Sequence, residues 1–501
     1  MRCDRGAATT TASSTASPST AAAAPKTGAP AFDVVQVLRE RGLLQDSTNE
    51  EALRDLATCE RVTVYCGFDP TADSLHLGNL LGIIVLAWFA RAGHSVVALC
   101  GGATGLVGDP SGKSAERPML DAELLRSNTA SIGAQLSSLL ASLSPDAAGS
   151  SDVRVVNNLD WFEGMSFLTF LREVGKHARV GTMLAKDSVR SRMESDGDGE
   201  GGGSGGSGGG LSFTEFSYQL LQGYDFLHLY REEGCRVQIG GSDQWGNITA
   251  GTDLIRRLAS PGTDEEGKGE GGEDAAAKAA RPPLAFGLTF PLLVGSDGKK
   301  FGKSEGGAIW LDGTKLSPFH MYQHLLRTPD SDVILFLKRL TFLPLDEVAR
   351  LEAAMDPAHP DHEGPNAAQR VLAGEVTRFV HGEGGLEEAL KVTRGLFAAR
   401  NMDGPPSLEV LEALVASGSA PKAQLSSTDV LGSPVVDLLV RVGLQPSKGA
   451  VKRMIKGGGI KVNNAPVKDE AGVVGEDEII AGRFVLLAAG KKNKIIVEIK
   501  G

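Results

Sequence analysis

The sequence predicts an α/β protein: a doubly wound parallel sheet, then a helical domain, then a small α+β domain. Three observations carry this prediction. Apolar, β-branched segments alternate with helical ones up to about residue 316. Helical periodicity alone occupies 317–399, and short strands follow a helix pair after residue 433. Strands alternating with helices favour a parallel, Rossmann-like sheet whose ligands bind beyond the strand ends.

Length and composition allow two to four domains in the 501 residues. No apolar run is long enough to predict a membrane span. The net charge of −11 argues against a generally basic nucleic-acid binder, although it permits a local basic patch. The 5 cysteines have no spacing typical of a metal site or a disulfide framework.

Residues 1–30 form a separate compositional block, rich in Ala, Ser and Thr and almost free of acids. This composition is typical of an organellar transit peptide, for a chloroplast or a mitochondrion. The alternative is a disordered tail without a targeting role.

The predicted sheet domain covers 33–316. We expect strands at 62–68, 95–102, 153–158 and 288–294. The first long helix is expected at 78–92. Two low-complexity segments, 195–210 and 262–280, cannot bury enough apolar surface to order, so we expect disordered insertions there.

The remainder divides into a helical domain at 317–399, a linker at 404–432 and a small domain at 433–501. We expect helices at 331–340, 345–355, 366–381 and 385–398. The small domain is expected to begin with helices at 435–442 and 448–456 and to continue with short strands.

A polar peptide follows the first predicted strand and leads into the first long helix. It runs Asp69-Pro-Thr-Ala-Asp-Ser-Leu-His-Leu-Gly-Asn79. A helix amino terminus offers unpaired N–H groups and a positive dipole end, which suit phosphate. Gly78 would let a flat base approach the backbone, and His76 can donate to phosphate oxygens. The alternative for His76 is an ordinary helix-capping histidine.

A second peptide, Lys300-Phe-Gly-Lys-Ser304, places two lysines on a glycine-containing loop. Their ammonium groups can stabilise charge on a leaving pyrophosphate. Gly302 would give such a loop the freedom to close on a substrate. The alternative is a solvent-exposed basic turn.

The segment 212–226 is predicted to be a helix that carries Tyr218, Gln222 and Asp225 on one face. Buried polar groups need partners, so this face favours a polar ligand. The alternative is a polar helix face in water.

The two signature peptides together resemble those of class I aminoacyl-tRNA synthetases, and the helix residues resemble the tyrosyl-tRNA synthetase family. The family pattern His-x-Gly-His has Asn79 at its last position here. The resemblance implies that Tyr65 and Asp225 bond the phenolic hydroxyl of tyrosine. It also implies that the α-ammonium is held by Asp109, Tyr218 and Gln222, with Gln238 as a further pocket residue.

The resemblance further implies ATP as a substrate, with Mg²⁺ on the nucleotide and no protein metal ligands. The expected ATP-binding residues are Gly67, Asp69, Gly78, Gly241, Asp243, Gln244 and Lys303. The residues expected to act on the phosphates are Thr71, His76, Asn79, Lys300, Lys303 and Ser304. The alternative role for Asp243 is a structural N-cap. The alternative for the glycine-rich loop that holds Asp109 is a Walker-type phosphate-binding loop, but the spacing of its glycines does not fit that motif.

A basic stripe without acids runs from residue 441 to 461. It predicts RNA binding by Arg441, Lys448, Lys452, Arg453 and Lys456, and it resembles the small RNA-binding domain at the end of bacterial-type tyrosyl enzymes. A solvated basic helix is the alternative. The family implies tRNA(Tyr) as partner and a homodimer, with 161–176 and the region of Phe213 as candidate contacts.

Two other functions compete with the tyrosyl hypothesis. A tryptophanyl relative would leave Tyr65 and Asp225 without a phenol to bind. A non-catalytic RNA-binding protein, such as a splicing cofactor on a synthetase scaffold, is supported by Asn79 but disfavoured by the intact lysines at 300 and 303.

Overall fold

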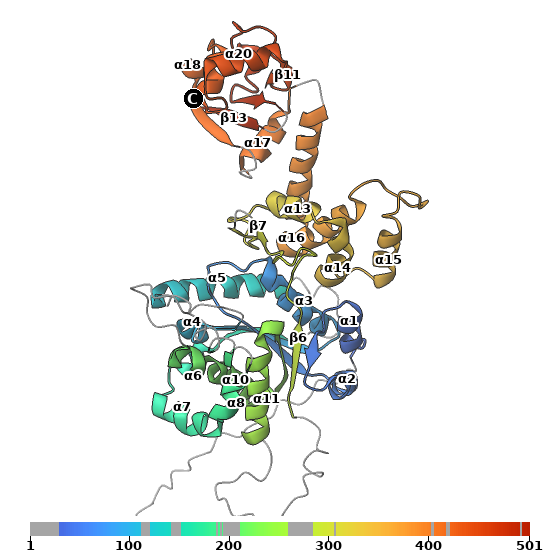
Figure 1. The fold of residues 1–501 in the computed structure, drawn as a ribbon, viewed down its shortest axis with the longest axis vertical. Coiled ribbons are helices and arrows are strands. Elements are labelled where there is room, and N and C mark those ends of the chain that lie inside the picture. The colour runs from blue at the N-terminus through green and yellow to red at the C-terminus, as the bar shows by residue number, and fades with distance from the viewer. Residues whose placement is uncertain are drawn as a thin grey trace, which may run out of the picture.

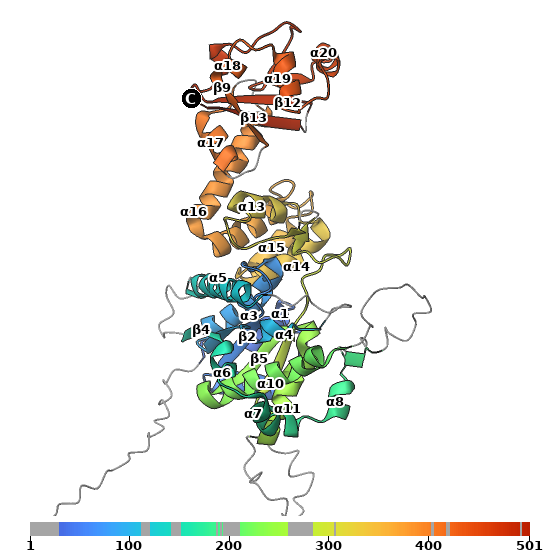
Figure 2. The ribbon, with the colours of Figure 1, turned by 90° about the vertical axis from the view of Figure 1, so that its left-hand side faces the viewer.

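The structure is a computed structural model in which three units follow one another along the long axis (Figures 1 and 2). It describes residues 30–111, 121–141, 152–186, 189–190, 193, 211–258, 284–304, 307–401, 405–416, 421–490 and 493–500. Residues 1–29 and both predicted insertions lie outside the described residues.

Within the described residues, six strands form the sheet of the first unit, in the order β1-β6-β5-β2-β3-β4. The pairs from β6 to β4 are parallel, and β1 joins the edge antiparallel. Because β3 and β4 extend the sheet on one side of β2 and β5 and β6 on the other, the switch point lies between β2 and β5. The strands are β1 Asp46–Ser47, β2 Thr63–Phe68, β3 Ser95–Cys100, β4 Val153–Asn157, β5 Cys235–Gly241 and β6 Phe286–Phe290.

Helices cover both faces of this sheet (Figure 1). Helix α3 is apolar all round, and its residues from Leu80 to Ala90 are all buried. The helices are α1 Val34–Glu40, α2 Glu50–Cys59, α3 Leu77–Arg91, α4 Thr104–Val107, α5 Ala122–Ala141, α6 Leu159–Phe162, α7 Phe167–Glu173, α8 Val180–Leu184, α10 Phe213–Glu233 and α11 Trp245–Leu258, with 3₁₀ turns η1 Gly175–His177 and η2 Ser242–Gln244.

The strands expected at 62–68, 95–102 and 153–158 and the helix at 78–92 are present as β2, β3, β4 and α3. The strand expected at 288–294 differs: β6 ends at Phe290. Pro291 follows, and a proline has no N–H for the ladder. The prediction that a strand extends to Val294 is therefore wrong.

The second unit is helical and packs on the first. Its elements are α13 Pro318–Leu326, α14 Asp330–Leu340, α15 Leu345–Ala353 and α16 Ala367–Asn401. Trp88 of α3 packs on Phe342 at 5.2 Å between ring centroids, and the Arg41 guanidinium lies 4.3 Å from the Trp88 ring. Inside α16, Gly382 has φ 72° and ψ 179°, so two helices meet there at a kink. The carboxyl-terminal part of α16 extends toward the third unit (Figure 2).

The third unit contains a five-stranded sheet among its described residues, in the order β11-β10-β12-β13-β9. Its elements are α17 Leu408–Ala416, β9 Lys422–Ser426, α18 Ser427–Val430, α19 Val435–Arg441, α20 Lys448–Lys456, β10 Ile460–Val462, β11 Ala465–Pro466, η3 Glu476–Glu478, β12 Phe484–Ala489 and β13 Asn493–Lys500.

The predicted linker at 404–432 is wrong for much of its length. Strand β9 pairs parallel with β13, from Ile496↔Lys422 to Lys500↔Ser426. Leu411 and Leu414 of α17 are buried in one cluster with Phe484 of β12. The third unit therefore begins well before residue 433.

Candidate active site

The candidate site lies where β2, β3 and β5 end, at the switch point of the sheet. Strand β2 leads into the loop before α3, β3 leads into Gly101, and β5 leads into η2. This edge is where a doubly wound sheet offers backbone N–H groups and loop side chains to a ligand.

Helix α10 brings Tyr218 and Asp225 into the interior beside this edge, where they are 4% and 2% exposed. The Tyr218 hydroxyl donates to Asp69 Oδ2 at 2.7 Å. Asp225 accepts from Asn158 Nδ2 at 3.1 Å and from Trp161 Nε1 at 2.9 Å. The polar face of the helix is thus turned inward, as a ligand pocket requires.

Tyr65 of β2 lies near Asp225. Its ring packs on Phe226 at 5.3 Å, and its hydroxyl has no hydrogen-bond partner among the described residues. Burial, followed by the nearby Asp225 carboxylate, raises the pKa of Tyr65. Burial raises the pKa of Asp225 to about 8, against the opposing effect of its two hydrogen bonds. An unpaired buried hydroxyl beside a desolvated carboxyl calls for a polar partner between them.

A second polar group surrounds Asp109, which is 5% exposed. Its carboxylate accepts from Gln244 Nε2 at 2.6 Å and from Asn247 Nδ2 at 3.4 Å. Asn247 Nδ2 also lies 3.0 Å from Gln222 Oε1. One network therefore joins Asp109, Gln222 and Gln244, from three separate parts of the sequence.

Strand β5 contributes Gln238 and Gly241, and η2 contributes Asp243. Gln238 lies inside the strand and is 2% exposed. An added Cβ at Gly241 would come within 2.6 Å of Asp243 Oδ1. Desolvation first, and then the Asp109 carboxylate, raise the pKa of Asp243, while the charge of Lys300 acts in the opposite direction. Lys300 is therefore close enough to Asp243 for its charge to act on the carboxyl.

The start of α3 meets the lysine-containing loop. His76 is the N-cap residue, and its N–H donates to Asn79 Oδ1 at 3.0 Å. A Cβ at Gly302 would lie 2.9 Å from the N atom of Gly78. The loop backbone thus rests on the first turn of α3, so the two signature peptides adjoin.

The loop is anchored on both sides. Val294 and Lys300 form an antiparallel bridge before it, and Trp310 forms one with His76 after it. Of Lys303 and Ser304 the structure describes the backbone, which forms β7 Lys303–Ser304 and pairs antiparallel with β8 Gly307–Ala308.

Gly67 and Thr71 lie toward the open side of the sheet. Gly67 is exposed although its neighbours in β2, Cys66 and Phe68, are buried. Thr71 is exposed in the loop before α3. Both positions leave room for a ligand against the strand end.

Sequence reasoning missed the residues that hold the predicted ones in place, namely Thr104, Ser111, Asn158, Trp161 and Asn247. Asn247 follows the expected ATP-binding residue Gln244 by three positions and could have been included. Asn158 follows β4 at the same edge of the sheet, a position that could also have been inferred.

The predicted RNA-binding residues lie on and near α20, but acids from flanking segments accompany them. Arg441 pairs with Asp429 at 2.8 Å and Lys448 with Asp437 at 2.7 Å. Lys452 and Lys456 lie 3.7 and 3.3 Å from Glu470, and Arg453 is exposed on the same helix. The absence of acids between 441 and 461 in the sequence therefore does not leave an unpaired basic stripe.

Comparison with known families adds to this geometry. Residues 57–398 match the family model of class I tRNA synthetases (W and Y), and residues 414–497 match a tyrosine–tRNA ligase SYY-like C-terminal domain. A chloroplastic/mitochondrial tyrosine–tRNA ligase of Arabidopsis thaliana is 51% identical over 93% of this chain and 84% of its own length. The chain belongs to the tyrosyl-tRNA synthetases.

Other tyrosyl-tRNA synthetases are similar over most of the chain. The tyrosine–tRNA ligase of Protochlamydia amoebophila (strain UWE25) is 47% identical over 93% of this chain and 99% of its own length. The crystal structure of a C-terminally truncated mitochondrial tyrosyl-tRNA synthetase from Aspergillus nidulans superposes with a TM-score of 0.61 at 34% identity, covering 73% of this chain and 94% of that one.

Proposed function

We propose that this tyrosyl-tRNA synthetase is a tyrosine–tRNA ligase that activates L-tyrosine with ATP and transfers it to tRNA(Tyr). The carboxylate of tyrosine attacks the α-phosphorus of ATP, which forms tyrosyl-adenylate and releases pyrophosphate. A hydroxyl of the terminal adenosine of the tRNA then attacks the activated carbonyl and releases AMP. The carrying observation is the buried hydroxyl of Tyr65, which has no hydrogen-bond partner in the described part of the chain and lies beside the carboxyl of Asp225.

This pair of groups recognises a phenol. The substrate hydroxyl would bond both Tyr65 and Asp225. Phenylalanine would leave the Tyr65 hydroxyl without this partner, and Asp225 would keep only its bonds from Asn158 and Trp161. A site that hydrogen-bonds a substrate hydroxyl rejects the analogue without it by about 10⁴–10⁵, and tyrosyl-tRNA synthetases are themselves the reference case.

The ammonium group of tyrosine would lie between Asp109, Tyr218 and Gln222. Asp109 and Gln222 are already joined through Asn247, and Tyr218 is held by Asp69. These contacts fix the acceptors before the substrate arrives, which favours a correct approach of its carboxylate to ATP. Gln238 would complete the wall of the pocket from β5.

The nucleotide would lie along the open ends of β2 and β5, against Gly67, Asp69, Gly78, Gly241, Asp243 and Gln244. Its phosphates would meet the amino terminus of α3, where Thr71, His76 and Asn79 lie, and the loop that carries Lys300, Lys303 and Ser304. Neither chemical step needs a protein nucleophile, so positioning and charge stabilisation supply the rate enhancement.

Mg²⁺ is expected with ATP. Within the described ranges no group of three His, Cys, Asp or Glu side chains could hold a metal ion. The negative charge of the ATP phosphates would hold the ion, and we derive no step from it.

Activity with amino acids tests the function directly. ATP–pyrophosphate exchange should proceed with tyrosine and be far weaker with tryptophan or phenylalanine. Exchange with tryptophan alone would indicate the tryptophanyl alternative. Exchange with none of the three, together with RNA binding, would indicate a non-catalytic RNA-binding protein.

The third unit would bind tRNA through Arg441, Lys448, Lys452, Arg453 and Lys456. Exposed ion pairs are worth little, so phosphates can replace Asp429, Asp437 and Glu470 as partners. Arg453→Glu should lower tRNA charging at limiting tRNA and leave pyrophosphate exchange unchanged. Lys422→Glu, on β9 of the same unit, is the control.

A homodimer is supported by an apolar surface on α7. Phe170 packs inward on Tyr224, whereas Phe167 and Leu168 are 62% and 76% exposed, and Phe213 is 67% exposed at the start of α10. The double variant Phe167→Asp, Leu168→Asp should sediment as a monomer. Leu431→Asp, at a residue 40% exposed in the third unit, should not change the sedimentation of the protein.

Location in a chloroplast or a mitochondrion rests on the composition of residues 1–30 and on the similarity to a chloroplastic/mitochondrial relative. Residues 1–30 fused to a fluorescent protein should direct it to an organelle, whereas diffuse fluorescence would contradict the transit peptide. No helix in the described part of the chain is long and apolar enough to cross a membrane.

A further inference from the structure

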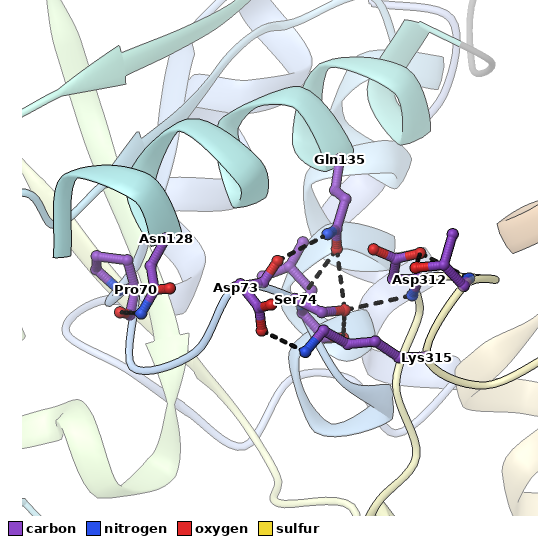
Figure 3. A network of polar contacts seen from close by, with 9 residues as sticks. Pro70, Asp73, Ser74, Asn128, Gln135, Asp312 and Lys315 are labelled. Carbon is purple, nitrogen blue, oxygen red and sulfur yellow. Dashed lines mark hydrogen bonds and ion pairs between the residues drawn. The ribbon is translucent and has the colours of Figure 1, made fainter. Parts of the chain in front are cut away.

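Helix α5 holds the loop that precedes His76 (Figure 3). Asn128 Nδ2 donates to the carbonyl oxygen of Pro70 at 3.1 Å, near the start of the loop. About two helical turns later, Gln135 reaches the end of the same loop. One helix therefore fixes both ends of the segment that connects β2 to α3.

Gln135 makes three contacts with three consecutive residues of this loop. Its Nε2 donates to the carbonyl oxygen of Asp73 at 3.3 Å. Its Oε1 accepts from the N–H of Leu75 at 3.0 Å and from the Ser74 hydroxyl at 3.3 Å. A neutral amide is the side chain that supplies both a donor and an acceptor at this reach.

The segment after the lysine-containing loop holds the same residues from the other side (Figure 3). Lys315 Nζ lies 2.5 Å from Asp73 Oδ1, and the N–H of Asp312 donates to Ser74 Oγ at 3.3 Å. The N–H of Leu311 donates to the carbonyl oxygen of Leu75 at 2.9 Å. Residues 311–315, which follow the lysine-containing loop, and residues 73–75, which precede His76, are thus joined by these contacts.

These contacts extend to His76 and to the lysine-containing loop, the two parts of the site that would contact the phosphates of ATP. Trp310 bridges to His76 along the backbone, with ring centroids 6.4 Å apart, and Lys315 Nζ lies 5.3 Å from the centre of the Trp310 ring. Moving Asp73 or Ser74 would therefore shift His76 and the lysine loop together. Small displacements of reacting groups cost large factors in rate.

We propose that Gln135 and Lys315 are positioning residues, which clamp the peptide Asp73–Leu75 from opposite sides and so fix His76 and the lysine loop relative to each other. The proposal rests on the proposed function. It predicts that losing either side chain slows tyrosyl-adenylate formation, while the tyrosine pocket, whose residues neither Gln135 nor Lys315 is seen to contact among the described residues, keeps its affinity.

The first test replaces Gln135 in the full-length protein. Gln135→Met keeps the size of the side chain and removes its hydrogen bonds, so kcat for ATP–pyrophosphate exchange should fall about tenfold. Gln135→Glu keeps the acceptor for Leu75 and Ser74 and should recover part of the loss. The dissociation constant of tyrosine without ATP should stay within about twofold. Ser138→Ala, on the exposed side of the same helix, should match wild type.

The second test is a double-variant cycle of Asp73 and Lys315. Lys315→Met and Asp73→Asn should each lower kcat, and the double variant should be no worse than either alone. The exchanged pair Asp73→Lys with Lys315→Asp should recover part of the loss. Arg378→Met, which breaks ion pairs with Glu375 and Glu383 in the helical unit, is the control.

Wild-type kcat in Gln135→Met and Lys315→Met would overturn the proposal, and so would a parallel loss of tyrosine affinity and of thermal stability in both variants. Either outcome leaves the proposed function intact as long as the wild-type protein exchanges with tyrosine. A wild-type protein inactive with tyrosine would remove the function and, with it, the proposal.

Discussion

Tyr65 of β2 and Gln238 of β5 are direct partners in the register of the two central parallel strands. Each carries a buried oxygen, Tyr65 Oη and Gln238 Oε1, that has no hydrogen-bond partner among the residues the structure describes. Leaving such atoms unpaired lowers stability. Two of them stand on paired positions at the switch point, where the proposed tyrosine pocket would supply their hydrogen bonds.

Tyr65→Phe removes one of these atoms and keeps the ring. The ligand-free protein should become more stable to urea by about 1 kcal/mol, because an unsatisfied buried hydroxyl is lost. The ratio of kcat/KM for tyrosine to that for phenylalanine should fall at least about tenfold in pyrophosphate exchange. Tyr322→Phe, at a buried position in the helical unit, should leave this ratio unchanged. An unaltered ratio in Tyr65→Phe would contradict the phenol pocket.

Asp225→Asn should change how stability depends on pH. The pKa of Asp225 is raised by burial to about 8 in the fold, so between its ordinary value of 3.8 and 8 the unfolded chain ionises while the fold keeps its proton. The wild type therefore has its full stability from this group below pH 4 and loses it as the pH rises to 8, by at most about 1.4 kcal/mol per pH unit.

The asparagine variant does not titrate, so its advantage in unfolding free energy over the wild type should grow from pH 5 to pH 8. Urea unfolding of the ligand-free proteins at several pH values measures this difference. Ser138→Ala, which leaves every carboxylate in place, should run parallel to the wild type. A constant difference between Asp225→Asn and the wild type would show that the carboxyl ionises normally.

Gly302→Ala should separate the lysine loop from α3. The added Cβ would lie 2.9 Å from the N atom of Gly78 and 3.5 Å from its Cα, and backbone cannot give way as a flexible side chain does. The kcat of adenylate formation should fall at least about tenfold, with unchanged tyrosine affinity. Gly374→Ala is the control, because an added Cβ there has nothing within 4 Å.

Asn79 should contribute to helix stability as well as to phosphate binding. Asn79→Ala leaves the His76 N–H without its acceptor and should lower the unfolding free energy by about 1 kcal/mol. Asn79→Asp keeps the acceptor and should retain stability, but its negative charge should slow adenylate formation with ATP. If aspartate destabilised the protein as much as alanine does, the capping role would be wrong.

Local sequence patterns were sufficient for β2, α3 and β3, which are mostly apolar, and for β4, whose valines flank Arg154. They failed where pairing is distant in the sequence. Strand β9 alternates polar and apolar residues over only five positions, with Ala423 and Leu425 as its apolar side chains, and it becomes a strand because β13 lies beside it. Its side chains on one face stay exposed, so the segment looked like a linker.

The candidate site likewise contains residues that a local pattern predicts and residues that depend on contacts distant in the sequence. Tyr218 and Asp225 could be predicted from helical spacing, and their inward direction follows from α10 packing on the sheet. Trp161 and Asn158, which bond Asp225, come from more than sixty residues away, as the separations of 64 and 67 show. Likewise Asp429 reaches Arg441 at the end of α19, and Glu470 reaches Lys452 on α20, through turns that no local pattern of charges reveals.

The kink at Gly382 divides α16 into two helical parts. From the kink to Asn401 the helix extends about 28 Å at 1.5 Å per residue. One degree of rotation at this glycine moves the far end by about half an ångström, by geometry from the same rise. A small backbone change at Gly382 is therefore amplified at the end of α16 that extends toward the third unit.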